Sequence, residues 1–404
     1  MARLENVTAR PLTLESRAQG IMERLKLPHL DGFMLAAPLG LIAFSIFTLF
    51  EATGDDVPGD PLYFVLRQTV YALIGIALMF AVARIDYSRF RELRVGIYST
   101  MIASICLVLV FGAAARGSRR WIELPYFRFQ PSELAKVLLV VSFAAFVIEH
   151  RRRGASWRST VRLLAIGLVP AALVFVQPDL GTGIVLSMIT ITVLFLAGLP
   201  WRHFAAIGAV AAFLGVITLI VAPAVGAPIL REYQQERLTS FLNPSDDPGD
   251  SGYQLNQSRI AVGAGERTGR GDQASQTELD FLPEHHTDFI FAVIGERYGF
   301  LGAAFVLSLY ALLVWRALRL LTLSKNLYGT LIAGGVAAML MFQVFVNVGM
   351  NLGIMPVTGI TLPLMSYGGS SVLVTFMAIG LLQSIHIQAQ LASRDSRAPT
   401  PLLR

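Results

Sequence analysis

Apolar residues along the chain are grouped in blocks that short polar segments separate. The blocks have about 17 to 25 residues, the length that a helix needs to cross roughly 30 Å of hydrocarbon. They predict ten membrane-spanning helices, at about residues 32–51, 65–84, 95–115, 134–149, 163–178, 182–199, 204–226, 287–315, 328–352 and 367–388. The predicted fold is an all-α polytopic membrane protein of about ten helices, with a large outer loop at 227–286.

The distribution of arginine and lysine predicts the orientation of these helices. The segments after the second, fourth, sixth and eighth helices all contain arginine, whereas the loops at 51–64 and 353–366 have neither Lys nor Arg. Positive charge gathers on the cytoplasmic side of membrane proteins. Both termini are therefore predicted in the cytoplasm, with tails at 1–31 and 389–404 and the membrane domain at 32–388.

Composition agrees with a membrane protein. Hydrophobic residues make up 54% of the chain and charged residues only 15%, against about a quarter charged in soluble domains. The net charge of +6 is interpreted as membrane topology, with no nucleic-acid partner. The single cysteine, Cys106, excludes an internal disulfide and is interpreted as packing.

Two predicted outer segments break the charge rule. The arginines are Arg116, Arg119, Arg120 and Arg128 in the first, and Arg231, Arg237, Arg259, Arg267 and Arg270 in the second. Arginine pairs bidentately with phosphate oxygens, so a diphosphate or an anionic lipid headgroup is a natural partner. Internal pairing with loop acids such as Glu123 or Glu236 is the alternative.

The long loop itself predicts some order. Apolar residues alternate with polar ones at 253–263, which indicates a short amphipathic helix on the surface. The glycine-rich stretch at 263–271 is predicted to be flexible.

The ten residues LPEHHTDFIF at 282–291 end the long loop and begin an apolar run. They place Asp288 at the bilayer edge, where ionisable groups are costly and usually face a cavity or a partner. His285 and His286 beside this carboxylate suggest a metal, but their spacing matches no specific ligand pattern. Hydrogen-bonded scaffolding is one alternative, and a divalent ion shared with a diphosphate is another.

A charged pair lies at the start of the predicted fourth helix. Glu133 and Lys136 are three residues apart and therefore share a helix face. The pair is interpreted as lining a cavity. The alternative is an ion pair that only joins two helices, with Lys136 reaching outward.

Proline and glycine interrupt the apolar pattern at 177–183 and 351–371. Non-helical backbone at membrane depth is tolerated where protein or a wet cavity covers it. Asp179 in the first segment either shapes a site or caps a tight turn. The second is predicted to be a re-entrant loop that offers the hydroxyls of Ser366, Tyr367, Ser370 and Ser371 to a ligand, unless its glycines serve only helix packing.

Together these stretches resemble the SEDS family of bacterial cell-wall polymerases, which includes RodA, FtsW and SpoVE. The resemblance covers about residues 32–390, in the motifs GSRRW at 117–121, FQPSELAK at 129–136, QPDLGT at 177–182, FLPEHHTDFIF at 281–291 and LPLMSYGGSS at 362–371. The form Arg128-Phe129-Gln130-Pro131 is most similar to RodA. The chain departs from the family at 263–272, where Gly-x-Gly-Gly, an aromatic residue and Gly-x-Gly are expected.

The resemblance implies a peptidoglycan glycosyltransferase that polymerises lipid II on the outer face of the bacterial cytoplasmic membrane during elongation. It implies a class B penicillin-binding protein as partner. It also implies catalytic roles for Asp288, Glu133 and Lys136. The residues then expected to bind substrate are Arg119, Arg120, Trp121, Asp179, Arg237, Glu284, His286, Ser366, Tyr367 and Ser370.

The chemistry of lipid II agrees with these residue types. Its sugar is α-linked to a diphosphate and the product linkage is β, so a single displacement inverts the centre and needs one carboxylate base. The departing diphosphate needs positive charge or a metal. No tightly bound cofactor is expected, and a divalent cation, Mg²⁺ or Mn²⁺, is the alternative to arginine and lysine alone.

Other functions share some of these features. A division polymerase of the FtsW type would use the same chemistry. A lipid II flippase or an ion-coupled transporter also has charged groups and broken helices within the membrane, but here the charges gather in the outer loops. A non-catalytic scaffold would have no requirement for Asp288.

Overall fold

The computed structural model describes residues 30–115, 118–124, 127–151, 156–222, 251–274, 276 and 281–395. Within these residues the fold is mostly helical, and eight helices are long and apolar enough to cross a membrane. Two further apolar helices, at Leu180–Leu196 and Trp201–Val216, have 17 and 16 residues. The prediction of about ten membrane helices is confirmed.

The helices follow the predicted spans closely. They are α2 (Gly32–Ala52), α3 (Tyr63–Ala83), α4 (Arg94–Phe111), α5 (Pro131–Arg151), α6 (Trp157–Val176), α7 (Leu180–Leu196), α8 (Trp201–Val216), α13 (Ile290–Leu323), α14 (Leu327–Asn351) and α15 (Gly369–Asp395). Short helices η1 (Tyr87–Arg91), η2 (Ile217–Val221) and η3 (Gly271–Gln273) lie between some of them.

The boundaries differ most at three helices. Helix α13 runs on to Leu323 and α15 to Asp395, so α15 enters the predicted C-terminal tail at 389–404. Charged residues can extend a helix beyond the apolar block, because the backbone bonds are internal to the helix. Helix α8 ends at Val216 and continues as the π-helix η2.

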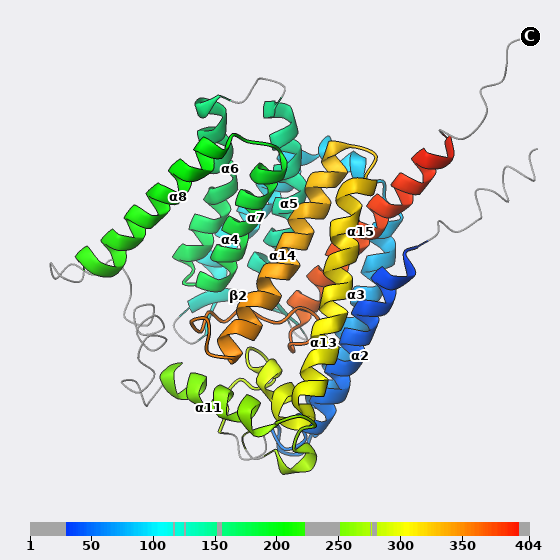
Figure 1. Ribbon diagram of the computed structural model, residues 1–404, viewed down its shortest axis with the longest axis vertical. Coiled ribbons are helices and arrows are strands. Elements are labelled where there is room, and N and C mark those ends of the chain that lie inside the picture. The colour runs from blue at the N-terminus through cyan, green and yellow to red at the C-terminus, as the bar shows by residue number, and fades with distance from the viewer. Residues whose placement is uncertain are drawn as a thin grey trace, which may run out of the picture.

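Helices α5, α14 and α15 form the centre of the bundle, and most of their residues are buried. Helix α3 packs along α15, and α7 packs against α5 and α14. By contrast, α8 has no buried residue and leans away from the other helices (Figure 1). Such an apolar helix is stable only where lipid covers it.

A three-stranded antiparallel sheet joins α4 to α5 and was not predicted. Its strands are β1 (Ala113–Ala115), β2 (Ser118–Leu124) and β3 (Phe127–Phe129), in the order β1-β2-β3. Glu123 lies opposite Arg128 in the register, with 3.6 Å between the charged groups. Arg128 therefore pairs with a loop carboxylate of the protein itself, which is the alternative that the sequence left open.

Helix α11 (Ser251–Ala264) lies at the end of the bundle opposite the C-terminal end of α15 (Figure 1). We call this the α11 end. The helix confirms the short helix predicted at 253–263, but it packs against α13 and α14. Leu255 and Ser258 are buried in this contact, whereas Ile260 is exposed.

The glycine-rich stretch after α11 was predicted to be flexible, and that prediction is wrong for the residues described. Its backbone is hydrogen-bonded to α13: Arg270 N donates to the Glu296 carbonyl at 2.8 Å, and Phe300 N donates to the Glu266 carbonyl at 2.9 Å. Helix α13 breaks at this point, because Gly299 has a φ of 63°. A Cβ on Gly269 would lie 2.0 Å from the Arg297 carbonyl oxygen, so glycine permits the close approach of two backbones.

Residues 352–368, between α14 and α15, are non-helical, and the run 362–366 is buried. Buried side chains of α2 and α3 hold this loop. Ser45 donates to the Met365 carbonyl at 2.7 Å, and Gln68 donates to the Ser366 carbonyl at 3.2 Å. The predicted break in the helical pattern is thus present, with its backbone groups bonded inside the protein, as membrane depth requires.

Candidate active site

Asp288 lies in a tight turn at the α11 end, two residues before α13 begins. The turn covers residues 283–289 and contains Glu284 at a φ of 59°. Glu284 accepts hydrogen bonds from Thr287, at 3.0 Å from the backbone N to its carbonyl and at 2.9 Å from the hydroxyl to its carboxylate. The turn thus leads directly into the N-terminus of α13, whose partial positive charge favours an ionised carboxylate.

Two asparagines of α14 hold the Asp288 backbone. Asn347 Nδ2 donates to the Asp288 carbonyl at 2.9 Å, and Asn351 Nδ2 donates to the same oxygen at 3.2 Å. Both side chains are fully buried. Since they lie one turn apart on α14, they fix the Asp288 main chain, and the Asp288 residue is half-buried.

Asn351 also joins three helices. Its Oδ1 accepts from Ala292 N of α13 at 3.1 Å and from the Ser258 hydroxyl of α11 at 3.3 Å. The Ser258 hydroxyl also lies 3.0 Å from the Asn351 carbonyl. A buried amide with this many partners orders the elements around it.

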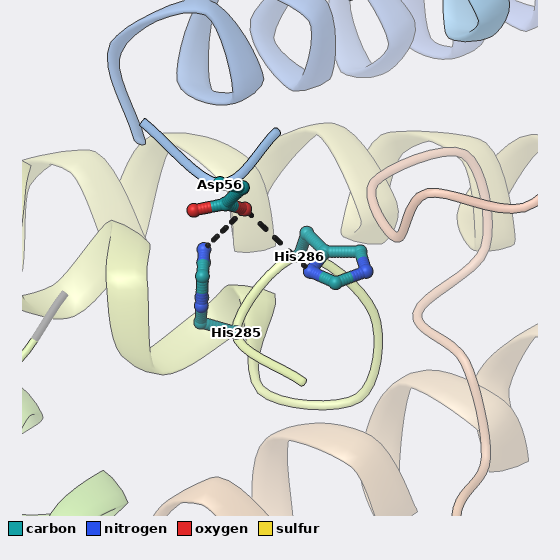
Figure 2. A group of neighbouring side chains, drawn as sticks. All are labelled: Asp56, His285 and His286. Atoms are coloured by element: carbon teal, nitrogen blue, oxygen red, sulfur yellow. Dashed lines mark ion pairs between the residues drawn. The ribbon is translucent and has the colours of Figure 1, made fainter. Parts of the chain in front are cut away.

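His285 and His286 lie in the same turn and meet Asp56, in the loop between α2 and α3 (Figure 2). The Asp56 carboxylate is 3.1 Å from His285 Nε2 and 4.0 Å from His286 Nδ1. The His286 carbonyl accepts from Tyr367 N at 2.9 Å. Residues 352–368 therefore contact the turn that carries Asp288.

The pair Glu133 and Lys136 is formed as predicted, on one face of α5. Lys136 Nζ is 2.7 Å from Glu133 Oε2. The Lys136 side chain is 3% exposed and the Glu133 side chain 9%. A buried ion pair needs good geometry and further bonds, because both charges lose their hydration. Lys136 does not reach outward.

Asp179 caps α7 and joins it to α5. Its Oδ1 accepts from Thr182 N at 3.2 Å, and its Oδ2 accepts from Gln130 at 3.1 Å and Ser132 at 3.3 Å. The capped turn that the sequence left as an alternative is observed. These bonds place Asp179 beside the first turn of α5, which carries Glu133.

Arg120 of β2 donates to the carbonyls of Gln177 and Pro178, at 3.3 Å for Gln177. Its guanidinium therefore joins the sheet to the α6–α7 connection. Trp121 follows it in β2 and is half-buried. Arg119 belongs to the same strand, but its side chain lies outside the described part, and so does Arg237. Substrate binding by these four residues stays a prediction.

The hydroxyls in the re-entrant loop are used inside the protein. Ser366 Oγ accepts from Leu362 N at 2.8 Å, and Ser370 Oγ accepts from Gln130 N at 3.0 Å and donates to the Arg128 carbonyl at 3.1 Å. Both serines are buried. Their predicted contact with a ligand is not shown. Ser366 bonds within the loop, and Ser370, in the first turn of α15, joins this helix to β3 and to the residue before α5.

Tyr367 is half-buried and packs against the Phe64 and His286 rings, with centroids 4.9 and 5.9 Å away. Its phenolic hydroxyl can donate a hydrogen bond.

A continuous set of contacts thus joins the predicted site residues. The Asp288 turn bonds to Tyr367, Ser370 bonds to Gln130, and Gln130 bonds to both Asp179 and the start of α5. Carboxylates, a lysine and an arginine lie along this set, an arrangement that can support proton transfer and anion stabilisation.

Sequence reasoning missed Asp56, Asn347 and Asn351. A signal for the asparagines was present, because two amides four residues apart in an apolar span share one helix face. Polar residues at such depth usually bond to another segment. No local pattern marks Asp56, since its loop approaches the histidines only in the folded chain.

Comparison with known proteins shows close relatives. The FtsW/RodA/SpoVE family of cell cycle proteins matches residues 30–391. The peptidoglycan glycosyltransferase MrdB of Escherichia coli K12 is 36% identical over 369 residues, which cover 91% of this chain and 96% of that protein. The probable peptidoglycan glycosyltransferase FtsW of Idiomarina loihiensis is 36% identical over 376 residues, covering 91% and 89%.

A solved structure is also similar. It is titled the structural coordination of polymerization and crosslinking by a peptidoglycan synthase complex, and it has 33% sequence identity and a TM-score of 0.76. The similarity covers 92% of this chain and 100% of that chain.

Proposed function

The chain belongs to the FtsW/RodA/SpoVE family, the SEDS proteins, and we propose that it is a peptidoglycan glycosyltransferase that polymerises lipid II during cell elongation. Relatives named peptidoglycan glycosyltransferase cover nearly its whole length. Relatives of both types are equally similar, and the Arg128-Phe129-Gln130-Pro131 form favours the elongation enzyme over the division enzyme. Asp288 is the general base of the proposed reaction.

The observation that carries this proposal is the anchoring of Asp288. Asn347 and Asn351 bind its carbonyl, and α13 begins two residues later. A base must be held in place and ionised before the reaction begins. The fixed main chain supports the first requirement and the helix N-terminus supports the second.

The reaction inverts one sugar carbon. The Asp288 carboxylate takes the proton of the acceptor hydroxyl, and the hydroxyl oxygen forms a bond to the anomeric carbon of the donor. The bond from this carbon to the diphosphate oxygen breaks, and its electron pair leaves with the diphosphate. A single displacement of this kind needs one base and no covalent enzyme intermediate.

The departing diphosphate gains negative charge, which nearby cations stabilise. Lys136 and Arg120 of β2 supply positive charge near Asp179 and α5. A divalent cation, Mg²⁺ or Mn²⁺, bound together with the diphosphate would supply the remaining positive charge. Such an ion arrives with the substrate and is not tightly held by the protein.

The proposed orientation places the α11 end outside the cytoplasm and both termini inside. The arginine distribution supports it. The similar solved structure is titled a peptidoglycan synthase complex that couples polymerization with crosslinking, and we propose a class B penicillin-binding protein as the cross-linking partner here.

The test is polymer formation from lipid II by the purified protein with its partner. Asp288→Asn keeps the shape but cannot accept a proton, so the rate should fall by about 10²–10⁴-fold. Asp60→Asn is the matched control, because Asp60 is an exposed carboxylate in the loop between α2 and α3. It should polymerise at the unchanged rate.

Normal polymer yield and rate from Asp288→Asn would end the assignment of the base. If the unchanged protein makes no polymer but moves lipid II between the leaflets of a vesicle, the transporter alternative holds. A protein that neither polymerises nor transports but still binds the partner would be a scaffold.

A further inference from the structure

The hydrogen bonds of His285 determine which of its ring nitrogens carries a proton. Nδ1 lies 3.2 Å from the Leu282 carbonyl oxygen. A carbonyl can only accept, so Nδ1 is the protonated nitrogen of this ring. In the neutral ring, Nε2 then points a lone pair at Asp56 Oδ2, 3.1 Å away. Two electron-rich atoms at this distance require a proton or a cation between them.

His286 brings a third donor atom to the same place. Its Nδ1 lies 4.0 Å from Asp56 Oδ2, and its ring packs on Phe64 with centroids 4.5 Å apart. The ligand atoms of Asp56, His285 and His286 all lie within 4.8 Å of one another, and Figure 2 shows them converging from two separate loops.

We propose that Asp56, His285 and His286 bind a divalent transition-metal ion. Two imidazoles and one carboxylate form a common ligand set for Zn²⁺ and related ions, with the remaining positions open to water. The bond from His285 Nδ1 to the Leu282 carbonyl is the outer contact that metal-bound histidines usually make. Imidazole suits these ions better than Mg²⁺.

The distances are compatible with one ion. Donor atoms that each lie about 2.1 Å from the metal are at most about 4.2 Å apart. The separations from Asp56 Oδ2, 3.1 and 4.0 Å, meet this limit. A shift of about half an ångström in the half-buried His286 side chain is enough to bring all three donors within it.

The ion would fasten the loop between α2 and α3 to the turn that carries Asp288. His285 is almost fully buried, and the Asp56 side chain is 23% exposed, so one side of the site opens to water. This binding site does not depend on the proposed polymerase function. It differs from an ion carried by the diphosphate, because protein side chains alone form it.

The test measures metal binding in the absence of lipid II. The full chain, purified in detergent with a histidine-free tag and stripped with a chelator, is titrated with Co²⁺ or Zn²⁺. We expect one saturable Co²⁺ site with visible absorption, one bound Zn²⁺ by elemental analysis, and a higher unfolding temperature with metal. An excess of Mg²⁺ should not displace Co²⁺.

Two variants address the ligands separately. His285→Gln and Asp56→Asn should each weaken metal binding by at least about tenfold, the effect that even outer contacts have on metal affinity. His203→Gln is the control, because His203 binds Thr160 on a different helix pair. Asp288→Asn should bind metal normally, which separates this test from that of the polymerase.

If His285→Gln does not fold, Asp56→Asn in the more exposed loop decides the result. The proposal is wrong if the unchanged protein shows no saturable metal site. It is also wrong if the Asp56→Asn variant binds metal as tightly as the unchanged protein. A proton on His285 would then bridge the pair. Displacement of Co²⁺ by the excess of Mg²⁺ would overturn the assignment to a transition metal.

Discussion

Asn347 donates a hydrogen bond from its side chain to the backbone carbonyl of Asp288 at 2.9 Å, and a second one to the Ile360 carbonyl at 2.7 Å. One buried amide thus holds both the turn with the proposed base and the re-entrant loop. Its position on α14 makes the geometry of Asp288 dependent on a residue with no expected contact to the sugar.

Asn347→Leu should lower the turnover rate and the stability together. The change removes the donor of the buried Ile360 carbonyl, at about 1–3 kcal/mol for an unsatisfied buried group. It also leaves the Asp288 carbonyl with the Asn351 donor alone. Thermal unfolding in detergent and lipid II polymerisation measure the two effects. Gln343→Leu, one turn away on the same buried face of α14, is the control and should retain its activity. Equal losses in both variants would mean that α14 packing, not Asp288, is affected.

The Glu133–Lys136 pair should show strong coupling. Removing one partner leaves a buried charge uncompensated, at a cost of roughly 3–5 kcal/mol. A double-mutant cycle with Glu133→Gln and Lys136→Met measures this coupling on stability and activity. The partly exposed pair Arg94 and Glu149, 2.8 Å apart, is the control and should give less than about 1 kcal/mol. Additive effects at 133 and 136 would refute the pairing.

Arg120→Gln should reduce stability as well as the use of lipid II. The guanidinium donates to the Gln177 and Pro178 carbonyls, and bonds to a charged group contribute about 1.5–3 kcal/mol. The unfolding temperature and the KM for lipid II are the measurements. Arg128→Gln removes an exposed arginine from β3 and should leave the unfolding temperature unchanged. A raised KM with unchanged stability in Arg120→Gln would point to substrate binding alone.

Gly269→Ala should destabilise the contact between the glycine-rich stretch and α13. Its φ is +84°, and the added Cβ would lie 2.0 Å from the Arg297 carbonyl oxygen, so the backbone must move. Strain of this kind costs on the order of 1–3 kcal/mol. Thermal unfolding and limited proteolysis measure the change.

Gly263→Ala is the matched control for this contact. An added Cβ there meets nothing within 4 Å, and the residue lies in α11. Alanine is the better helix former, so this variant should be neutral or more stable by about 0.5–1 kcal/mol. Equal stability of the two variants would show that the contact at Gly269 is loose in the folded protein.

The membrane helices could be predicted because each depends on its own apolar block. The Glu133–Lys136 pair was equally accessible, since both residues belong to one helix. The sheet at 113–129 was missed because its strands are short and carry no regular alternation. The glycine-rich stretch was misinterpreted because glycine indicates freedom locally but permits close backbone contact when another segment approaches.

The candidate active site also could be predicted only where local sequence patterns mark it. Asp288 was recognised from its place between a polar loop and an apolar run, which is a local feature. The contacts of Asn347, Asp56 and Arg120 join segments far apart in the chain, and no spacing rule gives them. Arg120 shows the cost of reasoning from charge alone, because its guanidinium bonds to protein carbonyls.

The break at Gly299 links the residues that follow α11 to the segment of α13 that begins after Asp288. Backbone bonds join residues 266–270 to both sides of the break, and the first part of α13, 290–298, leads back to Asp288. A displacement of α11 would be passed through this short segment to the turn that carries Asp288. The placement of the proposed base is thereby linked to the packing of α11.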